Sequence, residues 1–328
     1  MYSIAGKKIW IAGHNGMVGS ALVRRLESES CEILTAPRSV LDLTDTSAVN
    51  AWVSNYRPDV VVIAAAKVGG IHANNSAPVD FLQTNLQIQT NIMAASHGND
   101  VDRLLFLGSS CIYPKFADQP ITEDALLTGP LEPTNEWYAI AKIAGIKMAQ
   151  AYRQQYGRDW ISAMPTNLYG PGDNYNLETS HVLPALLRKF HEAKLAGDDD
   201  VVVWGSGSPL REFLHSDDLA DALVFLLKHY SQYEHINVGS GVEVTIRELA
   251  ETIASVVGYE ATLRFDASKP DGTPRKLMDS SRLQNMGWSS VRPLRSGLLQ
   301  TYEHWLAQEK HHFFPSKNSP HAGNTFNR

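Results

Sequence analysis

The chain has 328 residues, 43% of them hydrophobic, and a formal net charge of -6 at pH 7. This length predicts a globular protein with one large domain and a smaller one. Charges of both signs are interspersed, which excludes the basic field of a nucleic-acid-binding protein, and no apolar run reaches the roughly 18 to 20 residues of a membrane-spanning helix. The N-terminus lacks the pattern of a signal peptide, so we expect a cytoplasmic protein in which Cys31 and Cys111 remain thiols.

Short apolar runs alternate with helical patterns through the first half of the chain. Strands are predicted at Lys8–Gly13, 31–36, Asp59–Ala66 and 103–110, and helices at Met17–Ser30, 47–56 and about Pro78–His97. The run Asp59–Ala66 is apolar on both faces, as a buried parallel strand must be. Repeated βα units require right-handed crossovers and a parallel sheet with helices on both sides. The prediction is an α/β fold with a Rossmann-type doubly wound parallel sheet that binds a dinucleotide.

The rhythm changes beyond about Asn167, where Gly, Pro, Asn and Asp crowd into the segments 167–176 and 268–276. Between them the patterns predict a helix at 181–196, strands at 201–205 and 235–240, and helices at 216–230 and 245–258. We therefore expect a dinucleotide-binding domain over 1–166, to which later segments can return, and a smaller α/β substrate-binding domain over 167–310. The polar stretch 311–328 has no period and is interpreted as a frayed terminus rather than a second site.

Three glycines lie between the first predicted strand and the first predicted helix, in "GHNGMVG". Gly13, Gly16 and Gly19 follow a GxxGxxG spacing rather than GxGxxG. A tight strand-to-helix turn needs glycine for structural reasons alone, so the triplet by itself is weak evidence. Its position in a βαβ unit favours a turn that lets the backbone approach a pyrophosphate and offers it helix N-terminal N–H groups.

The end of the second strand indicates which dinucleotide is bound. An acidic residue there would bind the ribose 2′-OH of NAD, but "TAPRSVLDL" places Arg38 at this point, and a guanidinium suits a 2′-phosphate. We expect NADP(H), although Arg38 read alone could be an ordinary exposed cation. Asp42 comes too late for the ribose and is interpreted as a helix cap or an adenine contact. In "AAAKVGG", small residues would let the backbone lie against the cofactor, and Lys67 could simply be solvated.

Tyr138 and Lys142 are four residues apart in "WYAIAK" and so lie on one helix face. A lysine ammonium beside a phenol favours phenolate, lowering its pKa from about 10 towards neutrality, so that the tyrosine can exchange a proton with a carbonyl or an alkoxide. Ser109, at the end of the strand "LLFLGS", can donate to the same oxygen. The YxxxK spacing becomes informative because a nucleotide-binding turn and a strand ending in Ser-Ser precede it.

The chain resembles the extended short-chain dehydrogenase/reductases from about residue 8 to residue 305. The resemblance rests on "AGHNGMVGSAL", "AAAKVGGIHANN", "FLGSSCIYPK", "EPTNEWYAIAKIAGIKM", "MPTNLYGPGDNYN", "SHVLPALLRKF" and "PDGTPRKLMD". Within that family it is similar to the branch that converts GDP-4-keto-6-deoxy-D-mannose to GDP-L-fucose with NADPH, by epimerisation at C3 and C5 and reduction at C4. The resemblance implies Ser109, Tyr138 and Lys142 as the reductase triad, with Cys111 and His181 as the epimerisation pair.

The chemistry of a 4-keto sugar suits such a pair. Its C–H bonds at C3 and C5 are acidic because the carbonyl takes the carbanion's charge as an enolate, and inversion requires a base on one face and an acid on the other. A thiol of ordinary pKa about 8.5, lowered by nearby cationic groups, can be the base, and an imidazole of pKa about 6.5 can be the acid. Read alone, Cys111 could be a small buried apolar residue, and His181, which opens a helix pattern, could merely cap or pack.

The resemblance also implies the residues that hold the two nucleotides. For the cofactor they are Gly13, His14, Asn15, Gly16, Met17, Val18, Gly19, Arg38, Leu41, Asp42, Leu43, Ala65, Ala66, Leu107, Gly108, Ser109, Ser110, Tyr138, Lys142, Pro165, Thr166, Asn167, Leu168 and His181. For the GDP-sugar substrate they are Asn167, Lys189, Trp204, Arg211 and Asp279. Arg211 supplies a fork for phosphate oxygens, whereas Trp204 could instead belong to the core.

Two positions depart from the family pattern. Asn15 stands where arginine is common in the glycine turn, which removes a possible 2′-phosphate ligand. Lys189 falls where an arginine often contacts substrate, which keeps the charge but loses bidentate geometry.

Two other functions stay open. A related GDP-sugar epimerase/reductase, such as one that forms GDP-L-colitose, would invert only C5 of a 3-deoxy substrate. A non-catalytic dinucleotide sensor could reuse the fold, but it would have no need of the intact catalytic set. We also expect a homodimer, with no metal site and no nucleic-acid or membrane partner.

Overall fold

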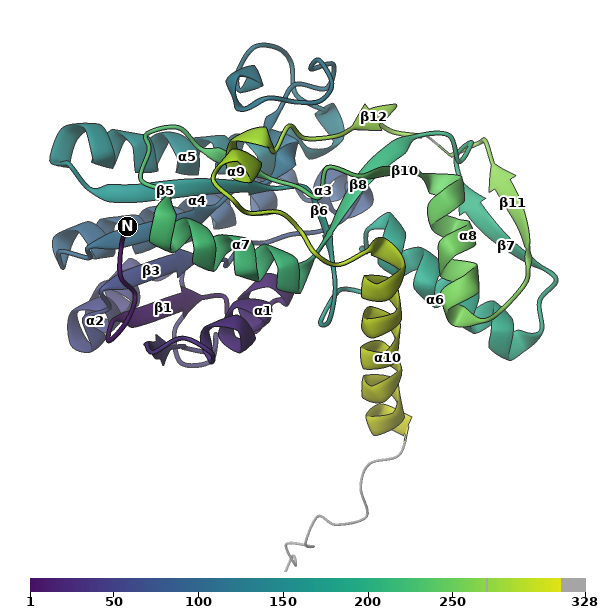
Figure 1. The fold of residues 1–328 in the computed structure, drawn as a ribbon, viewed down its shortest axis with the longest axis horizontal. Coiled ribbons are helices and arrows are strands. Elements are labelled where there is room, and N and C mark those ends of the chain that lie inside the picture. The colour runs from purple at the N-terminus through teal and green to yellow at the C-terminus, as the bar shows by residue number, and fades with distance from the viewer. Residues whose placement is uncertain (270, 314–328) are drawn as a thin grey trace, which may run out of the picture.

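A computed structural model describes residues 1–269 and 271–313 (Figure 1). Its strands are β1 Lys8–Ala12, β2 Glu32–Leu34, β3 Val60–Ile63, β4 Arg103–Leu107, β5 Asp159–Pro165, β6 Asn167–Tyr169, β7 Asp200–Trp204, β8 Leu210–His215, β9 Ile236–Val238, β10 Glu243–Thr245, β11 Thr262–Asp266 and β12 Arg275–Lys276. Its α-helices are α1 Met17–Leu26, α2 Thr46–Tyr56, α3 Ile71–Ser76, α4 Pro78–Gly98, α5 Glu136–Tyr156, α6 Val182–Ala196, α7 Ser216–His229, α8 Ile246–Val257, α9 Ser281–Asn285 and α10 Leu294–Phe313. Short 3-10 helices are η1 Ser110–Ile112, η2 Glu123–Ala125 and η3 Pro133–Asn135.

Six strands form one parallel sheet in the order β2-β1-β3-β4-β5-β9. The winding reverses between β1 and β3, because β2 is added on one side of β1 and β3 on the other. Ligands bind at such a switch point, beyond the carboxyl ends of the strands. The predicted doubly wound parallel sheet is confirmed, and this edge is where the site is expected.

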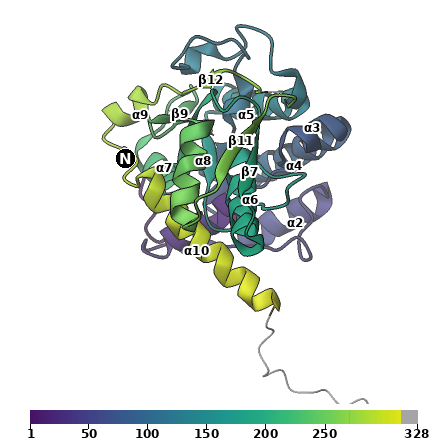
Figure 2. The ribbon, with the colours of Figure 1, turned by 90° about the vertical axis from the view of Figure 1, so that its right-hand side faces the viewer.

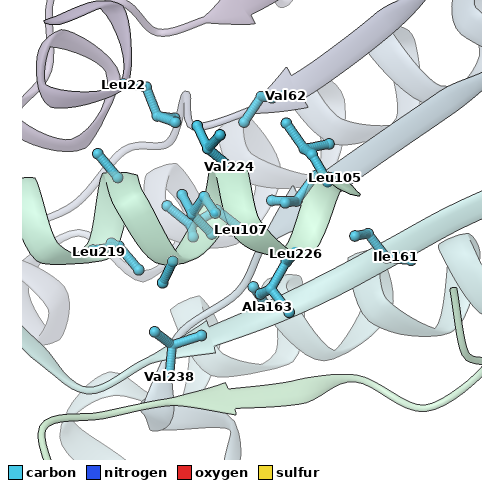
Figure 3. Close-up of a cluster of buried hydrophobic side chains, with 14 of the residues drawn as sticks. Leu22, Val62, Leu105, Leu107, Ile161, Ala163, Leu219, Val224, Leu226 and Val238 are labelled. Carbon is cyan, nitrogen blue, oxygen red and sulfur yellow. The ribbon is translucent and has the colours of Figure 1, made fainter. Parts of the chain in front are cut away.

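Helices cover both faces of this sheet and bury apolar side chains on it. Successive strand residues point to opposite faces. Ile11 of β1 therefore joins the core beneath α1 and α7, whereas Trp10 packs on Trp52 of α2, with ring centroids 4.5 Å apart. Figure 3 shows the first core, in which Leu22 of α1 and Leu219 of α7 lie among side chains from the strands.

Residues 216–238 return to this sheet after the chain has left it. α7 packs on α1, and β9 pairs with β5 in parallel. The first core therefore contains side chains that follow residue 166 by many positions, among them Leu223 and Val238. The division of the chain into substrate and cofactor domains stays a prediction.

A smaller lobe holds the remaining strands and three helices. β8 is the centre of a second sheet with β6, β10 and β12, and β7 pairs with β11. In Figure 2 this lobe faces the viewer, with α8 and α6 beside β7 and β11. Phe190, Leu249 and Leu298 are buried in its core, which α6, α8 and α10 contribute to. Within the described part of the chain, no helix is both long and apolar enough to cross a membrane.

Several predicted elements differ from the structure at their ends. α1 stops at Leu26 rather than Ser30, because the chain turns there: the Glu29 N–H donates to the Leu26 carbonyl. β3 ends at Ile63, and residues 64–66 form a loop. α10 extends three residues into the predicted tail of 311–328, and residues 314–328 lie outside the described part.

Candidate active site

The glycine turn between β1 and α1 has no room for side chains at two of its glycines. Gly13 has φ +93°, and a Cβ on it would lie 2.6 Å from the backbone nitrogen of Ala65. A Cβ on Gly19 would lie 2.1 Å from the Gly13 carbonyl oxygen. Gly16 is the N-cap of α1 and supplies no side-chain cap, so the first N–H groups of the helix remain available. These features fit the pyrophosphate of a dinucleotide.

The loop after β2 carries an exposed, positively charged side chain. Arg38 is exposed there. The Asp42 carboxylate is engaged by Thr44, accepting from its N–H at 2.9 Å and from its hydroxyl at 2.8 Å. Asp45 caps α2, so the interpretation of Asp42 as a helix cap is wrong. Leu41, predicted to touch the cofactor, places its side chain in the core against α2.

The chain turns sharply where β4 ends. A Cβ on Gly108 would lie 2.2 Å from the sulfur of Met164, so only glycine fits against β5 here. Ser109 then caps η1, and its hydroxyl accepts from the Cys111 N–H at 3.4 Å. The turn therefore brings Ser109 and Cys111 to the carboxyl edge of the sheet.

Tyr138 and Lys142 reach the same edge from the first turns of α5. Tyr138 hydrogen-bonds Ser109, and the Lys142 Nζ donates to the Leu107 carbonyl at 2.8 Å while lying 5.8 Å from the Tyr138 ring centroid. Burial raises the pKa of Tyr138 above its ordinary 10.0, with a smaller rise from Cys111, and the Ser109 bond opposes both. The phenol is therefore protonated at neutral pH, rather than shifted towards phenolate as the sequence suggested.

Lys142 is almost completely buried, at 4% exposure. Burial lowers the pKa of its ammonium from 10.5 to about 8, and the Cys111 charge partly offsets this. The lysine therefore keeps its charge at neutral pH and loses it in the mildly alkaline range.

The half-buried Cys111 lines a hollow together with Lys115, Asn135, Arg275 and Lys276. Its sulfur accepts a hydrogen bond from Nδ2 of Asn135 at 3.4 Å. The thiol also acts electrostatically on Tyr138 and Lys142, which places it beside these two side chains at the N-terminal end of α5. A nucleophilic or basic sulfur is thus adjacent to a proton donor.

His181 is the N-cap of α6, but its side chain makes no capping bond. His181 is exposed as a residue, although protein atoms surround its imidazole closely enough to desolvate it. That crowding, and then the charge of Lys276, lower its pKa below the ordinary 6.5. Because Lys276 also lines the Cys111 hollow, Cys111 and His181 both lie near this lysine. The preceding loop is anchored by Gly70, whose N–H donates to the Thr179 carbonyl at 2.8 Å.

An exposed indole lies in the smaller lobe. Trp204 is 57% exposed, so the alternative that it belongs to the core is wrong. The ammonium groups of Lys189 and Lys269 each lie 5.2 Å from its ring centroid. Lys189 also donates to the Val202 carbonyl at 3.0 Å. A flat aromatic face flanked by cations suits a purine base.

The other predicted substrate residues are partly engaged within the protein. Arg211 on β8 donates to the Leu210 carbonyl at 2.8 Å, and Asn167 on β6 donates to the Glu212 carbonyl at 2.8 Å. Parallel pairing sets Asn167 of β6 opposite Phe213, two residues along β8 from Arg211. The Asp279 carboxylate accepts from the Ser281 N–H at 2.8 Å, at the start of α9.

Comparison with known proteins places these features in a family. A family model described as the NAD dependent epimerase/dehydratase family matches residues 9–239. The chain belongs to this family. A solved structure shares this fold: a GDP-L-fucose synthetase from Naegleria fowleri, bound to NADP, matches with TM-score 0.87 and 29% identity over 94% of this chain and 97% of that one.

Other relatives are more similar to this chain in sequence than the Naegleria fowleri protein is. GDP-L-fucose synthase 1 from Arabidopsis thaliana is 63% identical over 300 residues, or 91% of this chain and 93% of that one. GDP-L-fucose synthase from Escherichia coli strain K12 is 55% identical over 317 residues, or 94% and 98%. GDP-L-colitose synthase from Yersinia pseudotuberculosis is 38% identical over 304 residues, or 92% and 99%.

Three side chains around the thiol were not predicted from the sequence. Asn135 directly precedes the helix that carries Tyr138, and its residue type alone would have suggested a helix cap. Arg275 and Lys276 come from β12, and only the pairing of β12 with β8 brings them to the site. No local pattern in the sequence signals that pairing.

Proposed function

We propose that the chain converts GDP-4-keto-6-deoxy-D-mannose to GDP-L-fucose with NADPH, by epimerisation at C3 and C5 and reduction at C4. The observation that carries the proposal is the Cys111 thiol beside Tyr138 and Lys142, because reduction of a ketone alone has no use for a thiol. The chain is 63% and 55% identical to the GDP-L-fucose synthases of Arabidopsis thaliana and Escherichia coli, against 38% to the GDP-L-colitose synthase, which supports the 6-deoxymannose substrate over the 3-deoxy one.

Cys111 and His181 would carry out the epimerisation. The Cys111 thiolate takes a proton from C3 or C5, and the electron pair of that C–H bond moves into the carbonyl to leave an enolate oxygen at C4. His181 then donates a proton to the same carbon from the opposite face, and the enolate electrons return to it. Its lowered pKa makes the protonated imidazole a stronger acid for this step.

Tyr138 would complete the reduction. Bound NADPH supplies a hydride for C4. Tyr138 donates its phenolic proton to the C4 oxygen as negative charge develops there, and Ser109 donates a hydrogen bond to that oxygen. The raised pKa of Tyr138 keeps the proton in place until it is needed. The Lys142 ammonium stabilises the tyrosinate that remains. Arg38 and the glycine turn would hold the phosphates of the cofactor.

Incubation with GDP-4-keto-6-deoxymannose and NADPH tests the proposal. We expect the NADPH absorbance to fall and NMR to identify the product as GDP-L-fucose. Preferred turnover of the 3-deoxy analogue, with inversion at C5 alone, would instead identify a colitose-forming enzyme. Binding of NADPH without turnover of either sugar would identify a dinucleotide sensor.

Variants separate the two halves of the reaction. With NADP+ in place of NADPH, Cys111→Ser should nearly stop solvent deuterium from entering C3 and C5, because a hydroxyl ionises far less readily than a thiol. His181→Asn should permit some exchange but little inversion. Tyr138→Phe is the matched control, which should bind NADPH and exchange deuterium yet lose about 100-fold or more in reduction kcat. Exchange at the wild-type rate in Cys111→Ser would remove the thiol from the mechanism.

We further propose a cytoplasmic homodimer in which residues 1–166 mainly hold NADP and residues 167–310 mainly hold the GDP-sugar. The neighbouring helices α4 and α5 carry exposed apolar side chains, namely Val79 on α4 and Trp137 and Ile140 on α5. A second copy of the chain would bury these side chains. Cys31 and Cys111 are free, as the mechanism requires of Cys111 and as the cytoplasm maintains. Sedimentation over a range of concentrations tests the dimer, and a monomer throughout would contradict it.

A further inference from the structure

We infer that Asn135 is a positioning residue for Cys111: its side-chain amide donates a hydrogen bond to the sulfur, which stabilises negative charge there, and directs the sulfur into the hollow. The inference rests on the proposed function and deepens it, because it assigns the group that activates the epimerisation base. Asn135 acts through Cys111 and requires no contact with the sugar.

In the contact between Asn135 and Cys111, the amide is the donor and the sulfur is the acceptor. Nδ2 of Asn135 lies 3.4 Å from Sγ of Cys111. An amide N–H only donates, and an ionised sulfur is a better acceptor than a neutral one, so the bond favours the thiolate. The backbone of Cys111 is held separately, since its N–H points to the Ser109 hydroxyl at 3.4 Å. The backbone and the sulfur of Cys111 are therefore each held by a separate hydrogen bond.

Asn135 stands where its side chain could cap α5 instead of contacting the sulfur. Asparagine is among the best N-cap residues, because its side-chain oxygen accepts from the exposed N–H groups of the first turn. Asn135 is the N-cap of α5, yet its side chain makes no capping bond. Its Oδ1 is buried without a hydrogen-bond partner among the described residues. The amide is turned away from the helix and towards the sulfur, at the expense of the cap.

Other charged and titratable groups around the sulfur act less directionally. Tyr138 and Lys142 on α5 interact with it electrostatically. The hollow is also lined by Lys115 and Glu132, which form an ion pair at 3.0 Å, and by Arg275 and Lys276 from β12. The cations favour a thiolate in general, but of these groups and Asn135, only the amide is hydrogen-bonded to the sulfur.

Alkylation of Cys111 by iodoacetamide tests the inference without any substrate, because the thiolate is the reactive form. The Cys111 peptide is followed by mass spectrometry across a pH series, which separates it from Cys31. In Asn135→Leu we expect the alkylation midpoint to rise by about one pH unit and the rate at neutral pH to fall about tenfold, the loss expected for a hydrogen bond to a charged group. Asn135→Asp, an isosteric residue that caps helices well, should shift the midpoint further because its carboxylate opposes the thiolate.

Thr134→Val is the matched control, at the neighbouring position of η3. It should fold, melt and alkylate as the wild type does. Wild-type alkylation profiles in both Asn135 variants would overturn the inference, whatever the substrate proves to be. If Asn135→Leu melts early, Asn135→Asp, whose side chain has nearly the same shape as asparagine, decides the question.

The second readout is catalytic. In the Asn135 variants, kcat for deuterium exchange at C3 and C5 should fall about tenfold with little change in KM, because the interaction strengthens as the sulfur becomes anionic. An increase in KM alone would show a binding role and contradict positioning. Shifted alkylation combined with normal exchange in Cys111→Ser would uphold the Asn135–Cys111 coupling while refuting the thiol base. The failure of the two proposals is thus distinguishable.

Discussion

Arg38 is the residue that we propose determines the choice between NADPH and NADH. Its guanidinium is exposed in the loop after β2, where the nearby Asp42 carboxylate is already occupied by Thr44. Arg38→Ala should weaken NADPH by about 1.5 to 3 kcal/mol and leave NADH almost unchanged, because only NADPH carries a 2′-phosphate. Fluorescence titration of the apoenzyme with each cofactor measures this difference. Equal losses for NADPH and NADH would show that Arg38 does not bind the 2′-phosphate.

In the proposed mechanism, Lys142 makes reduction sensitive to alkaline pH. Burial lowers its pKa to about 8, so the ammonium that stabilises the tyrosinate is present at neutral pH and is lost as pH rises through that value. We therefore expect the reduction kcat, at saturating substrate and cofactor, to decline above about pH 8, whereas an ordinary lysine would stay charged to above about pH 10.

Lys142→Arg provides the control for this decline, because a guanidinium does not lose its proton in this range. Whatever reduction activity remains in that variant should show no alkaline decline. A kcat that stays constant to pH 10 in the wild type, or a decline that persists in Lys142→Arg, would mean that a different group titrates.

At the scale of elements, the start of α3 sets the position of the loop that leads into α6. A Cβ on Gly70 would lie 2.7 Å from the Ser180 carbonyl oxygen and 3.2 Å from that of Thr179. Gly70→Ala should therefore push this loop and His181 away, costing about 1 to 3 kcal/mol of stability and reducing inversion at C3 and C5 more than NADPH binding. Urea unfolding and product NMR measure the two effects.

Gly98, the last residue of α4, is the matched position. Nothing lies within 4 Å of the place where its Cβ would be, so Gly98→Ala should be nearly neutral in both measurements. Similar behaviour of the two variants would show that the contact of Gly70 with residues 179 and 180 does not hold His181 in place.

The elements also differ in how far the sequence predicted them. α6, α7 and α8 have clear helical periodicity and were predicted to within one residue at each end. β8 and β12 were not predicted, because they are held mainly by pairing with distant segments and carry little local signal. The hollow beside Cys111 depends on β12, so it was missed for the same reason.

At the scale of the whole molecule, residues 1–166 cannot complete their own core. Leu219, Leu223 and Leu227 of α7 are fully buried in it, at 0% exposure. Burial of each leucine contributes about 1.5 to 3 kcal/mol to the free energy of unfolding. Loss of all three is therefore comparable with the total stability of a domain, which is about 5 to 15 kcal/mol. A fragment of residues 1–166 should therefore show no cooperative thermal transition by circular dichroism, whereas the full chain should. A cooperative transition in the fragment would show that α7 and β9 are dispensable.

A pair of single variants tests the same point in the full chain. Leu223→Ala should lower the free energy of unfolding by about 2 to 5 kcal/mol, because the core cannot refill the space. Leu195 on α6 is 75% exposed, and Leu195→Ala should change that free energy by less than about 0.5 kcal/mol.

The sequence by itself determined what depends on neighbours along the chain. The glycine turn, the buried strand β3 and the pairing of Tyr138 with Lys142 on one helix face all follow from spacings of a few residues. Local backbone geometry and periodicity are sufficient for these features, because one turn or one helix satisfies them.

Only the tertiary structure decided which distant groups meet. Asn135 turns its amide from the helix it could cap to the sulfur of Cys111, and Lys276 lies near both Cys111 and His181. The return of α7 and β9 to the first sheet likewise depends on contacts between segments that are distant in the sequence. Such contacts arise when separate elements bury their apolar faces together, and the free energy of that burial belongs to the assembled core rather than to any segment of the sequence.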